Sequence, residues 1–350
     1  DTRAEDGDKQ YALNSGFGAI DYLQDEAIAN IKDWTDVDLR YSLEVYDAEG
    51  LTDAPVKDRQ VIIVDKYEAV SFDLRLVPNR TYQFVVFADF VPEGEAKKEV
   101  NPAINAQANL GLHHVIGTTL QDITIVADAI NDESTDAYFI SKDLKITNSI
   151  PQSLVLQRPY GKIRVITTDL AELNLNVNPA RVVVTYDAHH PVAFNAVTGK
   201  IDTEVKAEAL TFESLYNEGV CKESLANHFY TAGYDDYARY GTVNANGEKR
   251  HTHMTLFTDY ILATEEHSPI HFIMSVYDGV NAEPIKTTEF DTEIPVQRNH
   301  LTTIIGNVLT TNTQINVTID DNFANEYVVN YASADTLEEL QKAIDSAKAG

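Results

Sequence analysis

The chain has 350 residues and carries 27 Lys and Arg against 55 Asp and Glu, a formal net charge of −28 at pH 7. So acidic a surface opposes binding to nucleic acid or anionic lipid headgroups, whose phosphates need basic partners, and both are excluded as expected partners. The length indicates two domains or one large all-β domain, and the single cysteine, Cys221, excludes an intrachain disulfide.

Residues 1–36 are predicted to form a polar leader. The chain opens on a charged stretch from Asp1 to Asp8 and lacks the apolar segment of a signal peptide. We therefore expect a mature form, in which a lipidated cysteine would lie upstream of the first residue and provide the only membrane attachment. Apolar spacing over 22–32 indicates a short helix within the leader. No apolar run reaches the length of about 18 residues that spans a bilayer.

Residues 37–157 are predicted to form an N-terminal antiparallel β-sandwich. Alternating apolar and polar residues, typical of half-buried strands, occupy 38–47 and 70–76. Residues 81–90 read as a strand rich in aromatic and β-branched side chains. Residues 91–136 are less regular, because proline and glycine interrupt them, and strand character resumes at 136–140. In the first strand, one face holds Leu39, Tyr41, Leu43 and Val45, and the other holds Arg40, Ser42, Glu44 and Tyr46.

Residues 158–332 are predicted to form a C-terminal β-sandwich, with the junction placed around 156–165. Its strands are expected at 181–186, at 255–262 and at 270–277, and the last two are expected to pair with each other. The stretch 193–200 reads as a turn region of this sandwich. A long loop over 217–253 is rich in tyrosine, and loops of that length are either functional or peripheral insertions.

The last part of this sandwich shows the clearest strand pattern in the chain. Two strands are predicted within 294–329, joined by a turn at Gly306-Asn307. Strict alternation over 315–319 marks a half-buried strand, and the acidic turn that begins at Asp320 is expected to stop it.

Residues 333–350 are predicted to form a short C-terminal helix. Asp335 or Thr336 would cap it, and acidic residues occupy its first turn. Its apolar stripe consists of Leu337, Leu340, Ala343, Ile344 and Ala347. The helix either ends the protein or opens a further β-helix domain, and the sequence favours neither reading.

Candidate site residues are weak in this sequence. The pairs His113-His114, His251/His253 and His189-His190, the last with Asp187, could contribute to a metal site, but spacing assigns none of them a third ligand. The carboxylate pairs Asp132-Glu133, Asp235-Asp236 and Asp320-Asp321 do not match a calcium loop and are expected in solvated turns. No nucleophile elbow, phosphate loop or zinc-protease motif occurs. We therefore expect no catalytic, cofactor-binding or metal-binding residues and no enzyme activity.

Six segments in order carry a resemblance to a known family. They are DLRYSLEVYDAEG at 38–50, NRTYQFVVFADF at 79–90, DAYFISKDLKI at 136–146, LQRPYGKIRV at 156–165, VVVTYDAHHPVAFNAVTGK at 182–200 and the run that begins at Ile294. With these segments the chain resembles the fimbrillin-like surface proteins of Bacteroidales bacteria. The resemblance implies two transthyretin-like antiparallel β-sandwich domains, export as a lipoprotein to the outer membrane surface, and a place in or beside type V pili. Implied partners are other pilus or surface subunits, or ligands on host or bacterial surfaces.

The resemblance also implies a mode of assembly. In pilus members an arginine-directed protease removes an N-terminal strand, and the extended terminus of a partner refills the groove by strand addition. The helix predicted at 333–350 stands where a stalk subunit would carry an extended donor strand. A pilus tip, an anchor or a stand-alone surface adhesin is therefore favoured. The rival readings are a carbohydrate-binding surface lipoprotein module, whose aromatic platform would come from the tyrosines at 230–240, and a non-catalytic front part of a larger surface enzyme.

Overall fold

The fold is described from a computed structural model. It describes residues 9–16, 37–50, 53–65, 69–94, 111–126, 130, 132–147, 152–167, 169–174, 177, 179–186, 190–202, 211–215, 240–243, 249–251, 254–266, 268–278, 280–310, 315–321 and 325–327. The helices predicted over 22–32 and 333–350 lie outside these residues.

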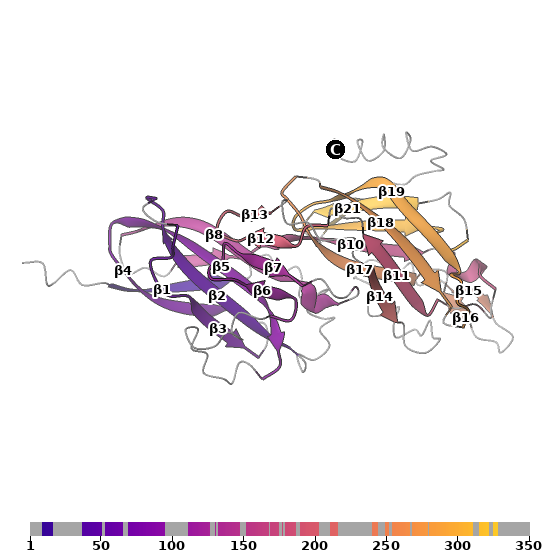
Figure 1. The fold of residues 1–350 in the computed structure, drawn as a ribbon, viewed down its shortest axis with the longest axis horizontal. Helices are drawn as coiled ribbons and strands as arrows, with labels where there is room; N and C mark the ends of the chain where they lie inside the picture. The colour runs from indigo at the N-terminus through magenta and orange to yellow at the C-terminus, as the bar shows by residue number, and fades with distance from the viewer. Residues whose placement is uncertain are drawn as a thin grey trace, which may run out of the picture. The chain divides into compact units, whose positions relative to one another are not determined.

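The chain folds into two compact units whose described residues lie mostly in β-strands, which confirms the mainly β fold of largely antiparallel sheets (Figure 1). The first unit comprises Asp1–Ala127, Glu133–Pro159 and Val192–Val205. The second comprises Asp128–Asp132, Tyr160–Pro191 and Lys206–Gly350. The helical elements among the described residues are two short 3-10 turns, η3 (Glu133–Thr135) and η4 (Leu170–Glu172). None of them has the length or apolar character to cross a membrane.

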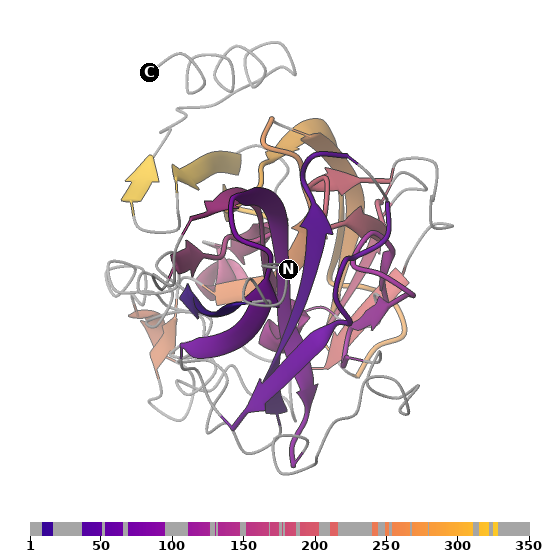
Figure 2. The ribbon, with the colours of Figure 1, turned by 90° about the vertical axis from the view of Figure 1, so that its left-hand side faces the viewer.

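The described strands of the first unit form three sheets, and Figure 2 shows them from the end of this unit. The order of the first sheet is β4 (Val70–Leu76), β1 (Lys9–Gly16) and β9 (Gln152–Val155). The order of the second is β3 (Gln60–Val64), β2 (Val37–Asp47), β5 (Arg80–Pro92) and β8 (Ala137–Ile146). The order of the third is β13 (Lys200–Ile201), β12 (Ala193–Asn195), β7 (Ile123–Ile125) and β6 (His114–Ile116).

The central strand β2 is buried on both of its faces, which differs from the half-buried strand expected from its alternation. The face expected to meet solvent holds Arg40, and its guanidinium lies 2.7 and 2.8 Å from the carboxylate of Asp89 on β5. A Cβ on Gly111 would lie 2.2 Å from that carboxylate, so the chain leading into β6 passes directly over the ion pair. Residues 111–126, expected to be irregular, thus supply the third layer that covers this polar face.

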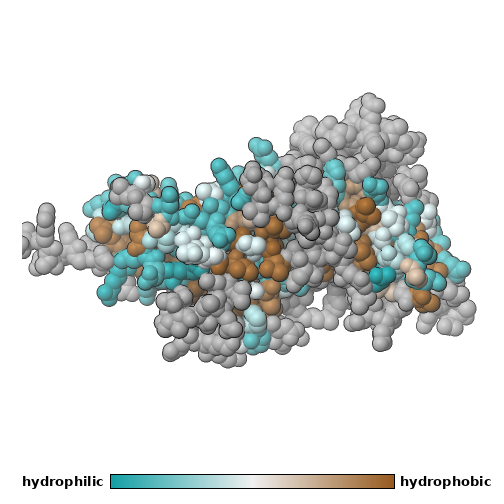
Figure 3. Space-filling view, viewed as in Figure 1, coloured by the Kyte–Doolittle hydropathy of each residue, from teal (hydrophilic) through white to brown (hydrophobic). Residues whose placement is uncertain are grey.

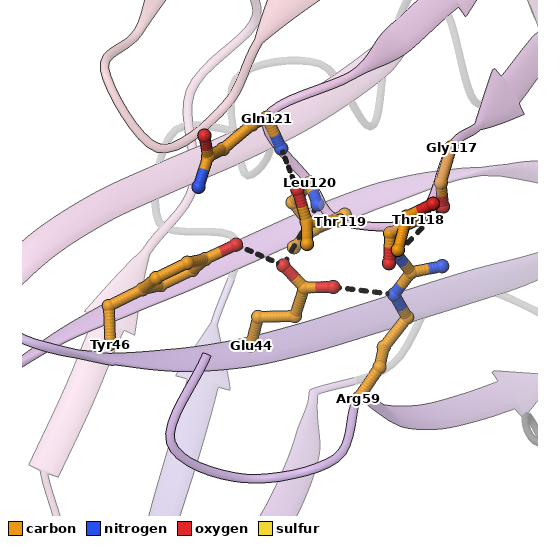
Figure 4. A network of polar contacts seen from close by, with 8 residues as sticks. All are labelled: Glu44, Tyr46, Arg59, Gly117, Thr118, Thr119, Leu120 and Gln121. Atoms are coloured by element: carbon orange, nitrogen blue, oxygen red, sulfur yellow. Dashed lines mark hydrogen bonds and ion pairs between the residues drawn. The ribbon is translucent and has the colours of Figure 1, made fainter. Parts of the chain in front are cut away.

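A second polar network joins β2 to the third layer at the turn before β7 (Figure 4). The Glu44 carboxylate accepts hydrogen bonds from the Leu120 N–H at 2.8 Å, from Arg59 Nε at 2.8 Å and from the Tyr46 hydroxyl. The Arg59 side chain continues to the carbonyl oxygens of Gly117 and Thr118, at 3.1 and 2.9 Å. Burial and the adjacent carboxylate raise the pKa of Tyr46, so its hydroxyl remains a donor.

The third layer also includes a hairpin from the C-terminal half of the sequence. Phe194 and Ala193 on β12 pair antiparallel with Ile123 and Thr124 on β7. Val197 O accepts hydrogen bonds from Ser141 Oγ at 2.7 Å and from Gln83 Nε2 at 3.0 Å. Its position in the sequence predicts a place in the second sandwich, whereas its strand pairing joins it to the first unit (Figure 1).

The described strands of the second unit form two larger sheets and a two-stranded ribbon. The order of the larger sheet is β17 (Met254–Leu262), β10 (Tyr160–Thr167), β20 (His300–Gly306), β21 (Ile315–Asp321) and β22 (Asn325–Tyr327). The order of the facing sheet is β14 (Thr211–Leu215), β11 (Arg181–Tyr186), β18 (Ser268–Tyr277) and β19 (Lys286–Val296). The ribbon pairs β15 (Tyr240–Val243) with β16 (Lys249–His251).

Aromatic contacts join the two larger sheets of the second unit. The ring of Phe257 on β17 meets that of Phe272 on β18 edge-on, with centroids 5.5 Å apart. The Tyr186 hydroxyl on β11 donates to Asp259 Oδ2 on β17 at 2.8 Å. Burial, followed by the Asp259 carboxylate, raises the pKa of Tyr186 well above its usual value. These contacts cross a sandwich core.

Two expectations about strands in the second unit were wrong. β17 and β18 do not pair, because β17 pairs with β10 in one sheet and β18 pairs with β11 and β19 in the other. The segment between them therefore crosses the sandwich rather than closing a hairpin. Asp320 and Asp321 also belong to β21 rather than to a turn that ends it, since both pair with residues of β22.

Candidate functional site

The feature of the first unit with the clearest functional geometry is the position of β1 between two other strands. β1 pairs antiparallel with β4, from Lys9 opposite Leu76 to Ser15 opposite Val70. It pairs parallel with β9, from Leu13 opposite Gln152 to Gly16 opposite Val155. The first described strand therefore occupies an interior place in its sheet, and without it β4 and β9 would be separated by the width of one strand.

β4 forms one wall of this strand position, and its side chains alternate as the sequence predicts. Val70, Phe72, Leu74 and Leu76 are buried, whereas Ser71, Asp73 and Arg75 are exposed. An occupant paired with such a strand shares its two faces, because residues opposite each other point to the same side of a sheet. The position therefore suits an extended segment with alternating apolar residues.

Sequence reasoning missed β1, which lies within the residues taken for a polar leader. The signal that could have found it is the sequence KQYALNSG, in which Tyr11 and Leu13 alternate with Gln10 and Asn14. So short a pattern has little predictive weight by itself. Pairing on both sides supplies the backbone hydrogen bonds that fix it as a strand.

The histidine pair at 113–114 is buried beside the Arg40–Asp89 ion pair. His114 Nδ1 lies 3.6 Å from Asp89 Oδ2, and the Nε2 atom of His113 lies 2.9 Å from Ser134 Oγ. Burial, followed by the charges of His113 and Arg40, lowers the pKa of His114 well below its usual value. This surrounding is that of a packed core, and among the described residues the pair belongs to no group of three or more His, Cys, Asp or Glu side chains that could hold a metal.

The other candidate residues do not meet in the described structure. His190 is buried with its ring 4.8 Å from that of Tyr186, and His251 ends β16. Asp187, His189, His253, Asp235 and Asp236 lie outside the described residues. The same holds for Cys221 and for the tyrosine-rich stretch as far as Tyr240, which begins β15. Within the described part of the chain, no group of three or more His, Cys, Asp or Glu side chains is arranged to hold a metal.

Large exposed hydrophobic side chains are scattered over the described residues. They are Val56, Val77, Val126, Val155, Ile273 and Val280. On the face shown in Figure 3, hydrophilic and hydrophobic residues are interspersed. Singly exposed apolar residues are ordinary on soluble domains, so we assign them no docking role.

A protein-family model matches almost the whole chain. Residues 2–346 match the model of DUF6562, described as a family of unknown function. The chain belongs to DUF6562. No curated protein matches it.

Several solved structures have a similar backbone fold at very low sequence identity. A fimbrial assembly protein from Parabacteroides distasonis is 12% identical with a TM-score of 0.42, and the match covers 92% of this chain and 98% of that one. The fimbrial anchor protein Mfa2 from Porphyromonas gingivalis is 11% identical with a TM-score of 0.40, covering 93% and 100%. A protein from Bacteroides thetaiotaomicron, provisionally described as polysaccharide-binding, is 9% identical with a TM-score of 0.42, covering 91% and 98%.

Proposed function

We propose that this member of DUF6562 is a fimbrillin-like cell-surface protein with a structural or adhesive role. It is exported to the outer membrane surface, where it acts as a pilus tip, an anchor or a stand-alone adhesin. Its partners are other surface subunits or ligands on host or bacterial surfaces. Support comes from the six ordered sequence segments that resemble fimbrillin-like proteins, and from the mainly β fold in two compact units.

The observation that carries this proposal is the interior place of β1. Because β1 is flanked by β4 and β9, an extended segment of another chain would take its place in the sheet by pairing with the same two neighbours. Main-chain hydrogen bonds to β4 and β9 would supply affinity, and the alternating burial of β4 would select the register. In this role the first unit is the acceptor of a strand donated by a different subunit.

Strand exchange can be tested with a protease site introduced between β1 and β2, within residues 17–36. After cleavage, a fluorescent peptide with the sequence of residues 7–18 should replace the severed strand, as measured by fluorescence anisotropy and size-exclusion chromatography. The cleaved protein alone should remain monomeric, since the proposal gives it an acceptor role. A cleaved protein that takes up no peptide, or that forms a ladder of oligomers by itself, would contradict the proposal.

A further inference from the structure

β9 is held by both of the facing sheets of the first unit. Within the described strands its ladder partner is β1, so β9 is the edge of the three-stranded sheet. Just beyond it, Gln157 bridges to Phe139 on β8, in the other sheet. The Phe139 N–H donates to the Gln157 carbonyl at 2.7 Å, and the Gln157 N–H donates to the Phe139 carbonyl at 2.9 Å. The chain therefore steps from one sheet to the edge of the next within a few residues.

Arg158 fixes this step with a buried ion pair. Its Nε and Nη2 atoms lie 2.7 and 2.6 Å from Asp136 Oδ2, and the side chains of Arg158 and Asp136 are 1% and 0% exposed. Asp136 also accepts hydrogen bonds from the Tyr138 hydroxyl at 2.7 Å and from the Ala137 N–H at 2.9 Å. The guanidinium carbon lies 5.1 Å from the centre of the Tyr138 ring.

This arrangement resists movement of β9. Displacing Arg158 would strand a buried carboxylate, and uncompensated buried charge is among the costliest defects in a protein core. Leu154 and Leu156, on either side of the end of β9, are also buried, which anchors the same segment by packing. The hydrogen bonds of Gln157 and the ion pair of Arg158 run to Phe139 and Asp136, which lie in or next to β8.

We propose that Arg158 is a positioning residue for the strand position: with Asp136 it moors β9 to β8, so that the gap between β4 and β9 stays one strand wide when β1 leaves. This inference rests on the proposed function, because the gap matters only if β1 is exchanged. Neighbouring strands lie about 4.7–4.9 Å apart, so β4 and β9, with room for one strand between them, are about twice that distance apart. Without the mooring, β9 would fray or approach β4, since its unpaired backbone groups need partners.

The test compares two buried arginines in the cleaved protein described above. Arg158→Gln removes the mooring, and Arg40→Gln is the matched control, because Arg40 is equally buried and pairs with an aspartate in the same unit. We expect at least a tenfold weaker peptide affinity for Arg158→Gln than for Arg40→Gln and the unsubstituted protein. Hydrogen exchange at 152–155 in the strand-free state should accelerate in Arg158→Gln alone.

The possible results distinguish the role of Arg158 from strand exchange itself. Equal peptide affinity in the two variants would overturn the mooring while leaving strand exchange intact. Failure of the unsubstituted cleaved protein to take up peptide would overturn the proposed function, and the mooring with it. If Arg158→Gln does not fold, Arg158→Lys replaces it, because lysine keeps the charge but not the fork of donors. It should bind the peptide more weakly than the unsubstituted protein, and equal binding would count against the mooring.

Discussion

Phe194 on β12 packs edge-to-face against Phe139 on β8, with ring centroids 4.8 Å apart, so a residue from the C-terminal half of the sequence completes the core of the first unit. We expect Phe194→Ala to destabilise the first unit by about 3–5 kcal/mol, the usual cost of truncating a buried phenylalanine. Hydrogen exchange should accelerate in β7 and β8. Phe257→Ala, in the core of the second unit, is the control and should leave those strands protected.

The sequence predicted strands well and layers poorly, and β2 shows why. Its alternation correctly separates the face of Leu39 from the face of Arg40, but a period of two says only that the faces differ. Burial of the second face depends on Asp89 and on the third layer, and no local pattern contains those distant partners. In β4 the same alternation predicts a half-buried strand correctly, because the side chains on its polar face are exposed to solvent.

The candidate site escaped prediction for a related reason. β1 becomes a strand through pairing with β4 and β9, which are far from it in sequence. The hairpin around Phe194 likewise takes its place from β7, so its sequence position misled the assignment to a unit. In both cases long-range pairing decided the structure, and a local pattern of a few residues could not.

Glu44 is expected to hold the third layer onto β2. Glu44→Ala removes the acceptor shared by the Leu120 N–H, Arg59 Nε and the Tyr46 hydroxyl, and should cost about 3–5 kcal/mol as a broken buried charge network. Urea unfolding measures the loss. Arg80→Ala serves as the control, because the Arg80 side chain is 36% exposed in its pair with Asp47 and should cost about 0–1 kcal/mol. Equal losses for the two variants would contradict this role for Glu44.

Acid is expected to weaken the first unit through His114. Because the folded-state pKa of His114 lies well below its usual value, the unfolded chain binds a proton that the folded chain does not, and stability falls as the pH drops below about 6.5. Burial raises the pKa of Asp89 despite the opposing charge of Arg40, and a proton retained there by the folded protein opposes the trend.

The pH dependence is checked by comparing urea midpoints at about pH 7.5 and about pH 5.5. His114→Phe cannot take up a proton and keeps an aromatic ring beside Phe87, whose ring centroid lies 5.4 Å from that of His114. The variant should lose less stability on acidification than the unsubstituted protein. An identical loss in both would show that His114 is not the responsible group.

Gly161 in β10 is expected to tolerate no side chain. A Cβ there would lie 2.4 Å from Val296 Cγ1 and 2.6 Å from the carbonyl oxygen of Gln297, and the backbone atom cannot move aside cheaply. Gly161→Ala should destabilise the second unit by about 1–3 kcal/mol through overpacking. Hydrogen exchange would localise the effect to β10 and its neighbours, and unchanged protection there would refute it.

The central claim, that β1 occupies an exchangeable position, can be tested with a disulfide that locks the strand. Asn14 and Ser71 are opposite each other on β1 and β4, so cysteines at these two positions, with Cys221→Ser, are close enough to bridge. Cysteines at Asn14 and Asp73 are out of register and serve as the control. After cleavage between β1 and β2, uptake of the labelled peptide is measured under oxidising and reducing conditions. We predict that the reduced protein takes up the peptide and the oxidised protein does not, whereas equal uptake in both states would contradict the account.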